Sequence, residues 1–248
     1  MPKSIEIFGF HSIESILKSN PELVLNVLIQ NERKDKRINE LINTLSSQKI
    51  SYSFADKVFL DKISKGELHQ GVISSVIPPS ILNEESFIQS ITRFNQNSLI
   101  LILDSIQDPR NLGACLRSAN AAGVSHVIIN KDGSAPINSL VHRTSAGAIN
   151  SLEIFHVTNL SRIIQQIKKR DIWVIGLDGN TESSIYNVNL TGSIAIVVGS
   201  EGKGIRSLIK KNCDQIISIP MAGNIESLNV SVATAIALFE SKRQREST

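Results

Sequence analysis

Three loops of this 248-residue chain hold most of the side chains that could do chemistry. They cover residues 103–124, 199–205 and 221–229, and each follows a short apolar run that is typical of a buried strand. The backbone N–H and C=O groups of such loops need hydrogen-bond partners, which either a bound ligand or an ordinary turn provides. The few polar side chains in the loops therefore decide what kind of site they could form.

The first loop leads into an expected helix, Leu112–Ala122, in which Arg117 is the one charged residue. A lone guanidinium on such a helix either extends toward water or is aimed at an anion. Asn111 stands where a helix N-cap belongs, and Gly123 where a C-terminal cap belongs. Taken alone, Asn111 is therefore expected to cap the helix.

The second loop reads GSEGKGI, and its glycines allow the backbone to approach a ligand closely. Glu201 would repel a phosphate, so the loop favours a ligand with positive charge or hydroxyl groups. The glycine spacing is not that of a dinucleotide-binding fingerprint, and no Gly-Lys-Ser/Thr sequence of a P-loop is present. A nicotinamide-dependent dehydrogenase is therefore the least favoured function.

The third loop is rich in small and polar residues, and Gly223 allows it to turn sharply. A helix of mostly small residues is expected to start near Asn229, so another backbone could pack closely against it. The loop is either a cofactor-binding loop or an ordinary turn between strand and helix. A metal site is not expected, because the five histidines are scattered without ligand spacing. Neither Cys115 nor Cys213 has a neighbouring histidine in sequence.

Regular alternation of apolar runs and helical patterns begins at Ser98 and predicts a buried, mostly parallel sheet. Ligands of such sheets bind beyond the carboxyl ends of the strands, which is where the three loops lie. The expected strands are 99–103, 127–129, 152–157, 172–177, 194–198 and 216–219. The expected helices are 112–122, 137–146, 160–170, 205–211 and 230–243.

Residues 1–76 show a separate α/β pattern and are expected to form a domain of their own, followed by a linker at 77–97 and a larger domain at 98–248. Pro78 and Pro79 stiffen the linker, which holds a short helix around 86–91. In the first domain we expect strands at 24–29, 51–54 and 72–77, and helices at 12–18, capped by Ser12, and at 35–47. A basic cluster near the start of the second helix is expected to be a solvated face; it consists of Arg33, Lys34, Lys36 and Arg37.

The overall composition is that of a globular protein, with 41% hydrophobic residues and a net charge of +3. This charge permits a nucleic-acid partner if the basic residues segregate, but does not require one. The two distant cysteines indicate no disulfide framework. We expect a soluble, cytoplasmic protein, because the chain has no signal peptide and no run of about 18 apolar residues that could span a membrane.

Taken together, the three loops resemble the three signature motifs of the SpoU (TrmH-type) RNA 2′-O-ribose methyltransferases, within the SPOUT superfamily. The matching segments are Asp108–Gly113 with Arg117, Gly199–Gly204, and Ile219–Met221 with Ser227–Ser231. Two further segments, Gly9–Ile13 and His69–Val72, look like the small RNA-binding domain of this family. The resemblance covers almost the whole chain, and it is strongest to members that methylate a guanosine in the peptidyl-transferase loop of 23S ribosomal RNA.

The resemblance implies an N-terminal domain similar to ribosomal protein L30e and a catalytic domain whose C-terminal chain forms a trefoil knot. It implies that S-adenosylmethionine binds among the last two loops, held by Gly199, Ile219 and Leu228, with Met221 and Ser227 beside them. It also implies a homodimer that packs through the knotted domains. Because the acceptor is a ribose 2′-hydroxyl, DNA is excluded as a substrate.

The resemblance further assigns catalysis to Asn111, Arg117, Glu201 and Asn229. Arginine keeps its proton in proteins, so Arg117 is expected to clamp a phosphate, while Glu201 accepts a hydrogen bond or the hydroxyl proton. The residues expected to meet RNA are His11, Arg33, Lys34, Lys36, Arg37 and Lys203. Two other functions stay open at this stage, a tRNA guanosine 2′-O-methyltransferase and a non-enzymatic RNA-binding or ribosome-assembly factor.

Overall fold

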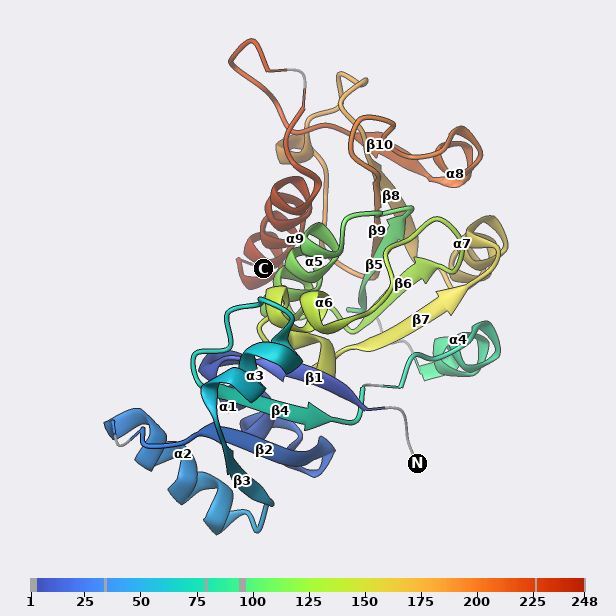
Figure 1. Ribbon diagram of the computed structural model, residues 1–248. Helices are drawn as coiled ribbons and strands as arrows, with labels where there is room; N and C mark the ends of the chain where they lie inside the picture. The colour runs from blue at the N-terminus through green and yellow to red at the C-terminus, as the bar shows by residue number, and fades with distance from the viewer. Residues whose placement is uncertain (1–3, 34, 79, 94–96, 226, 248) are drawn as a thin grey trace. The chain divides into compact units, whose positions relative to one another are not determined.

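A computed structural model describes residues 4–33, 35–78, 80–93, 97–225 and 227–247, which form two compact units (Figure 1). The first unit groups Met1–Pro79 with Ile137–Ser151, and the second groups Ser80–Pro136 with Leu152–Thr248. Two residues considered above, Lys34 and Pro79, lie outside the described residues. No helix in the described part of the chain combines the length and the apolar composition needed to cross a lipid bilayer.

The first unit is built on a mixed four-stranded sheet with the order β1-β4-β2-β3. Its strands are β1 (Ile5–Phe8), β2 (Val24–Gln30), β3 (Tyr52–Ala55) and β4 (Val72–Val76). Only β2 and β3 pair in parallel; β4 runs antiparallel to β1 and to β2. The helices of this unit are α1 (Phe10–Ser19), α2 (Lys36–Ser47), α3 (Lys57–Ser64) and, from later in the chain, α6 (Ser139–Thr144). Apolar residues of α1, α2 and the sheet form its main core.

Helix α1 begins at Phe10, so the predicted cap at Ser12 is wrong. Gly9, with φ of +83°, turns the chain into the helix without a side-chain cap, and Ser12 is buried in the first turn. Strand β1 and helix α3 were not predicted. In β1, apolar residues flank Glu6, whose carboxylate accepts a hydrogen bond of 2.7 Å from Ser75 Oγ on the neighbouring strand. This long-range partner is what makes a charged residue acceptable in that strand.

The second unit is built on a six-stranded sheet with the order β10-β8-β9-β5-β6-β7, in which every pairing is parallel, as predicted. The strands are β5 (Leu99–Asp104), β6 (His126–Asn130), β7 (Glu153–Val157), β8 (Trp173–Leu177), β9 (Ile194–Gly199) and β10 (Gln215–Ile217). All six residues of β5 and of β9 are buried, which fits central strands of a sheet covered on both faces.

Helices cover both faces of this sheet. They are α4 (Glu84–Ser90), α5 (Pro109–Ala122), α7 (Leu160–Lys168), α8 (Ser207–Asn212) and α9 (Val230–Glu246). Residues of α4, α7 and α8 share one apolar core with alternate residues of the strands. Helices α5 and α9 lie side by side (Figure 1). Short 3-10 turns occupy Pro21–Leu23, Ile91–Arg93, Ala148–Ser151 and Ile185–Asn187.

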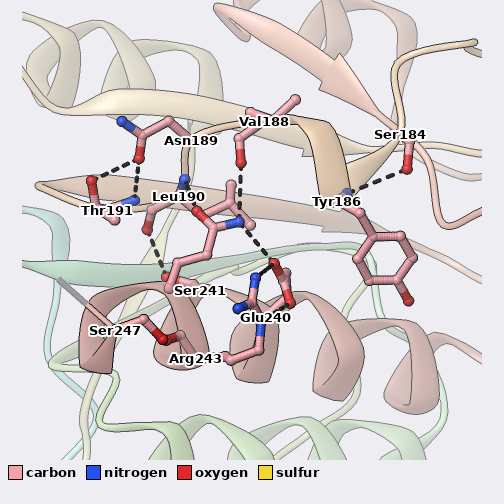
Figure 2. A network of polar contacts seen from close by, with 11 residues as sticks. Ser184, Tyr186, Val188, Asn189, Leu190, Thr191, Glu240, Ser241, Arg243 and Ser247 are labelled. Carbon is pink, nitrogen blue, oxygen red and sulfur yellow. Dashed lines mark hydrogen bonds and ion pairs between the residues drawn. The ribbon is translucent and has the colours of Figure 1, made fainter.

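The segment that enters β9 is tied to the last turns of α9 (Figure 2). The Gln244 side chain accepts a hydrogen bond from the Leu190 backbone N–H (2.8 Å) and donates one to the Val188 carbonyl (3.1 Å). Ser241 Oγ donates to the Leu190 carbonyl at 3.0 Å. Glu240 and Arg243 also lie on α9. Hydrogen bonds from Arg243 lower the pKa of Glu240 to about 2, so this carboxylate is charged at neutral pH. These contacts fix α9 against a segment about 50 residues earlier in the chain.

His142, in α6, makes the stability of the first unit depend on pH. The side chain is 2% exposed, its Nε2 atom has no partner among the described residues, and burial lowers its pKa from 6.5 to about 4. As the pH falls below 6.5, the unfolded chain therefore takes up a proton that the folded chain does not, and stability decreases until about pH 4. The gap corresponds to roughly 3 kcal/mol. We expect His142→Leu to lose less unfolding free energy than the wild type between pH 7 and pH 4, measured by urea denaturation. An equal loss in both proteins would contradict this account.

Candidate active site

A pocket of about 500 Å³ opens beyond the carboxyl ends of three neighbouring strands, β8, β9 and β10. It is lined by residues 177–180, 198–204 and 227–230, together with Ile219, Met221 and Ala233. The second and third loops of the sequence analysis therefore share one cavity, as expected from their places after parallel strands. Its lining includes apolar side chains such as Val198 and Ile219 as well as the carboxylates of Asp178 and Glu201.

The second loop closes into a tight turn at the end of β9. The Gly204 N–H donates to the Ser200 carbonyl at 2.9 Å, and Gly202 and Gly204 have φ of +77° and +64°. A Cβ atom on Gly199 would lie 2.0 Å from the carbonyl carbon of Gly204. The absence of a side chain at Gly199 is therefore required by the loop itself, and it brings two stretches of backbone together at the pocket.

An ion pair between the exposed Arg206 and the buried Asp104 holds the end of this loop. Asp104, the last residue of β5, is fully buried, and its carboxylate accepts hydrogen bonds from Arg206 N (2.9 Å) and Nε (2.7 Å). A buried carboxylate without a partner would cost several kcal/mol, so the pair strongly favours this loop conformation. The contact joins the central strand of the sheet to the glycine-rich loop across 102 residues of sequence.

Three of the four candidate catalytic residues, one from each of the three loops, form one hydrogen-bonded group. Asn229 Nδ2 donates to Asn111 Oδ1 at 3.1 Å and to Glu201 Oε1 at 2.5 Å. Asn229 Oδ1 accepts from the backbone N–H of Ser231 at 2.9 Å, so Asn229 caps α9, which starts where the sequence predicted. One asparagine side chain therefore links all three loops.

The predicted capping role of Asn111 is wrong. The N-cap of α5 is Asp108, whose carboxylate accepts a hydrogen bond from Arg110 N at 2.8 Å, and Pro109 occupies the first helical position. Asn111 lies within the first turn instead, which leaves its side chain free to contact Asn229. Gly123, with φ of +81°, ends the helix as predicted.

Arg117 lies on α5, about two turns after Asn111, and its residue is exposed. It does not line the pocket, and no described residue forms an ion pair or hydrogen bond with its guanidinium. The structure thus places Arg117 on the helix that carries Asn111 without joining it to the polar network. An exposed, unpaired guanidinium on a helix beside the pocket is available to an anionic ligand.

All five candidate cofactor residues, and Lys203 as well, line the pocket; the five are Gly199, Ile219, Met221, Ser227 and Leu228. Sequence reasoning missed a fourth loop, residues 178–180, which follows β8. Asp178 in this loop pairs with Lys210 at 3.1 Å and accepts a hydrogen bond of 2.9 Å from Asn180 N. The available signal was an aspartate directly after a buried apolar run, the same pattern that Asp104 shows at the end of β5.

Two arginines of the basic cluster in the first unit have specific partners and are not simply solvated, as the sequence led us to expect. The Arg37 guanidinium binds both Glu14 oxygens (3.0 and 3.1 Å) and lies 4.5 Å from the centre of the Phe10 ring. Arg33 pairs with Asp35 at 2.6 Å and donates to the carbonyl of Gln70. Lys36, the remaining described member, is less constrained, because its side chain is 91% exposed. His11, another candidate for RNA contact, is exposed, with Nδ1 3.5 Å from Arg37.

Neither cysteine fits a nucleophilic role. Burial raises the pKa of Cys115 to about 11, and burial also raises the pKa of Cys213 to about 12, so both thiols stay protonated at neutral pH. Within the described residues, no group of three or more histidine, cysteine or acidic side chains could hold a metal ion. Asn111, Arg117, Glu201 and Asn229 stay the predicted catalytic residues.

Two sequence profiles match this chain. The SpoU rRNA Methylase family matches residues 98–239, and the domain described as RNA 2'-O ribose methyltransferase substrate binding matches residues 7–82. The chain is 46% identical over 243 residues to the 23S rRNA (guanosine-2'-O-)-methyltransferase RlmB of Haemophilus influenzae, which covers 98% of each protein.

Solved structures show the same fold. A structure described as an RNA 2'-O ribose methyltransferase superposes with a TM-score of 0.81 at 28% identity, over 98% of this chain and 89% of the other. The SpoU methyltransferase AviRb from Streptomyces viridochromogenes, in complex with the cofactor AdoMet, superposes with a TM-score of 0.81 at 24% identity, over 98% of this chain and 91% of the other.

Proposed function

The chain belongs to the SpoU rRNA methylase family, and from this membership we propose that it methylates the 2′-hydroxyl of a guanosine in 23S ribosomal RNA, with S-adenosylmethionine as the methyl donor. The single observation that carries the proposal is the 46% identity to a 23S rRNA (guanosine-2'-O-)-methyltransferase over 98% of both chains. The site supports it, because the three loops of the family resemblance meet through Asn229. A 23S rRNA substrate places the proposed reaction in the cytoplasm, where bacterial ribosomal subunits assemble.

The pocket suits S-adenosylmethionine in size and in lining. A cavity of about 500 Å³ is within the usual range for ligands of this size. The apolar side chains of Leu177, Val198 and Ile219 suit the adenine ring, and the backbones of Gly199, Ile219 and Leu228 offer hydrogen-bond partners. The carboxylate of Asp178 suits the hydroxyl or ammonium groups of the ligand. Met221 and Ser227 complete the lining.

The reaction forms a bond between the ribose 2′-oxygen and a methyl carbon. When bound, S-adenosylmethionine supplies that methyl group on a sulfonium, whose carbon–sulfur bond breaks to leave a thioether. The hydroxyl proton must leave, and Glu201, which is joined to Asn111 through Asn229, carries a carboxylate that could accept it. Arg117 keeps its own proton, so it serves to clamp an RNA phosphate and hold the ribose in line.

In this proposal, residues 1–76 bind the RNA, residues 77–97 link the two domains, and residues 98–248 carry out catalysis. The match of residues 7–82 to a substrate-binding domain supports the first part. The mixed sheet of the first unit is compatible with an L30e-like domain. Of the described candidate residues in this domain, Arg33 and Arg37 are held by acidic partners at 2.6 and 3.0 Å. Lys36 pairs with Glu40 only at 3.8 Å and its side chain is 91% exposed, so Lys36 and the exposed His11 are better placed to meet RNA phosphates. Lys203 would act similarly beside the pocket.

We also propose that the C-terminal part of the chain forms a trefoil knot and that the protein is a homodimer. The contacts of α9 with residues 188–192 support the knot, because they hold the C-terminal helix against an earlier loop. Val232 and Phe239, each 46% exposed, support the dimer, because residues seven apart lie on one face of α9. An exposed apolar face of this kind is typical of a subunit interface.

We expect Phe239→Glu to convert the protein to monomers, because a carboxylate in a dimer interface loses its hydration without gaining a partner. Sedimentation equilibrium at micromolar concentration would measure the mass. Leu208→Glu is the matched control, because Leu208 is 64% exposed but lies on α8. A monomeric wild type would overturn the dimer, and a dimeric Phe239→Glu variant would place the interface elsewhere.

The function is tested by incubating the purified protein with methyl-labelled S-adenosylmethionine and 23S rRNA that lacks ribose methylation. The expected result is one labelled 2′-O-methylguanosine, located by nuclease digestion and mass spectrometry. Unmodified tRNA is the parallel substrate, because label in tRNA alone would assign the chain to the tRNA-modifying branch of the family. Binding of RNA without binding of S-adenosylmethionine would indicate a non-enzymatic RNA-binding factor.

A further inference from the structure

The side chain of Asn229 has a fixed orientation. Its Oδ1 atom accepts hydrogen bonds from Ser231 N (2.9 Å) and from Ser231 Oγ (2.6 Å). A backbone N–H can only donate, so the amide atom that faces it must be the oxygen. The nitrogen therefore faces the opposite side, toward Asn111 and Glu201. The usual ambiguity between the oxygen and nitrogen atoms of an amide does not arise here.

All donors of Asn229 are already used. Its Nδ2 carries two hydrogen atoms, one directed to Asn111 Oδ1 (3.1 Å) and the other to Glu201 Oε1 (2.5 Å). An asparagine side chain offers two donors, so none is left for a substrate. Its oxygen likewise already accepts two hydrogen bonds.

The two partners of Asn229 are left with complementary free groups. Asn111 receives a hydrogen bond on Oδ1, so its Nδ2 points away, and this Nδ2 has no acceptor among the described residues. Glu201 is held through Oε1, and its Oε2 has no donor in the described part of the chain. The network thus presents one hydrogen-bond donor and one carboxylate oxygen from two different loops.

We propose that Asn229 is a positioning residue that does not contact the RNA. It holds Asn111 with its N–H groups toward an oxygen of the substrate, and it holds Glu201 with one oxygen free to accept the hydroxyl proton. This inference rests on the proposed function for the identity of the substrate. Asn229 cannot at the same time donate a hydrogen bond to the RNA, because both hydrogen atoms of its amide are donated to Asn111 and Glu201.

Asn229→Asp separates positioning from helix capping. Aspartate is as good an N-cap as asparagine, so the hydrogen bond from Ser231 N and the start of α9 are preserved. The two donors are lost, and a second carboxylate then faces Glu201 Oε1. We expect kcat to fall about 10- to 100-fold, with the Kd for S-adenosylmethionine and the melting temperature close to those of the wild type. An unchanged kcat would overturn the proposal and leave Asn229 as a cap only.

The chain offers a matched control for this substitution. Asn189 Oδ1 accepts from Thr191 N (2.9 Å) and Thr191 Oγ1 (2.7 Å), the same local pattern as at Asn229 (Figure 2). Asn189 does not line the pocket. Asn189→Asp therefore makes the same chemical change in the same local geometry, and we expect wild-type kcat. An equal loss in both variants would show that the effect comes from added negative charge and would overturn the proposal.

A spectroscopic measurement separates this proposal from the proposed function. In the wild-type protein, we expect the Asn229 side-chain amide protons to exchange with water more slowly than those of Asn111, measured by ¹⁵N–¹H NMR without substrate. Fast exchange at Asn229 would overturn the positioning role whatever the enzyme methylates. Slow exchange in a protein that does not methylate 23S rRNA would leave the positioning role intact and overturn the proposed function alone.

Discussion

Gly199→Ala is expected to abolish binding of S-adenosylmethionine. The new methyl group would lie 2.0–2.2 Å from three backbone atoms of Gly204 and Ile205, far inside van der Waals contact. Backbone atoms cannot move aside as a flexible side chain can, so the turn between Ser200 and Gly204 must open. That turn forms one wall of the pocket. We expect the Kd, measured by isothermal titration calorimetry, to rise at least 100-fold, together with a lower melting temperature.

The control for this substitution is Gly223→Ala in the third loop. Gly223 has no positive φ, and no atom lies within 4 Å of the position of its Cβ. It also lies outside the pocket lining. We expect a Kd within about twofold of the wild type. If Gly199→Ala bound S-adenosylmethionine normally, the ligand would not lie against the second loop, and the assignment of the pocket would be wrong.

The sequence predicted the second unit well because its signals are local. Six continuous apolar runs separated by helical patterns require a covered parallel sheet, and all six strands form within about two residues of the predicted bounds. The position of loops after parallel strands also predicted that they would meet, and Asn229 joins them as this reasoning required. The start of α9 followed from the same local evidence, an asparagine before a run of helix formers.

The remaining features depend on partners distant in sequence. Asp104 and Arg206 are 102 residues apart, and neither shows on its own that an ion pair with a buried carboxylate holds the glycine-rich loop. Arg37 looked like part of a solvated cluster because the pattern gives no sign of Glu14 or of the Phe10 ring beneath it. Asn111 was misread because Asp108 and Pro109, three and two residues earlier, form a better start for α5. In each case, the side chain's partner in the folded protein could not be identified from the sequence.

Arg117→Ala is expected to lower kcat/KM for 23S rRNA by about 10²–10³-fold, the usual effect of removing one group that stabilises developing charge. The guanidinium is exposed and has no partner among the described residues, so its loss should change neither the melting temperature nor the Kd for S-adenosylmethionine. Arg117→Lys keeps the charge but loses the planar pair of donors, so we expect an intermediate value.

Arg170→Ala makes the same change in net charge at another exposed arginine, just after α7 and outside the pocket lining, and should keep kcat/KM within about twofold. Single-turnover kinetics at saturating RNA would then distinguish binding from catalysis. A loss that disappears at saturating RNA would make Arg117 a binding contact only, whereas a loss that persists means that it acts on the ribose in the transition state. Wild-type kcat/KM in Arg117→Ala would remove this residue from the site, and another group would have to hold the ribose in line.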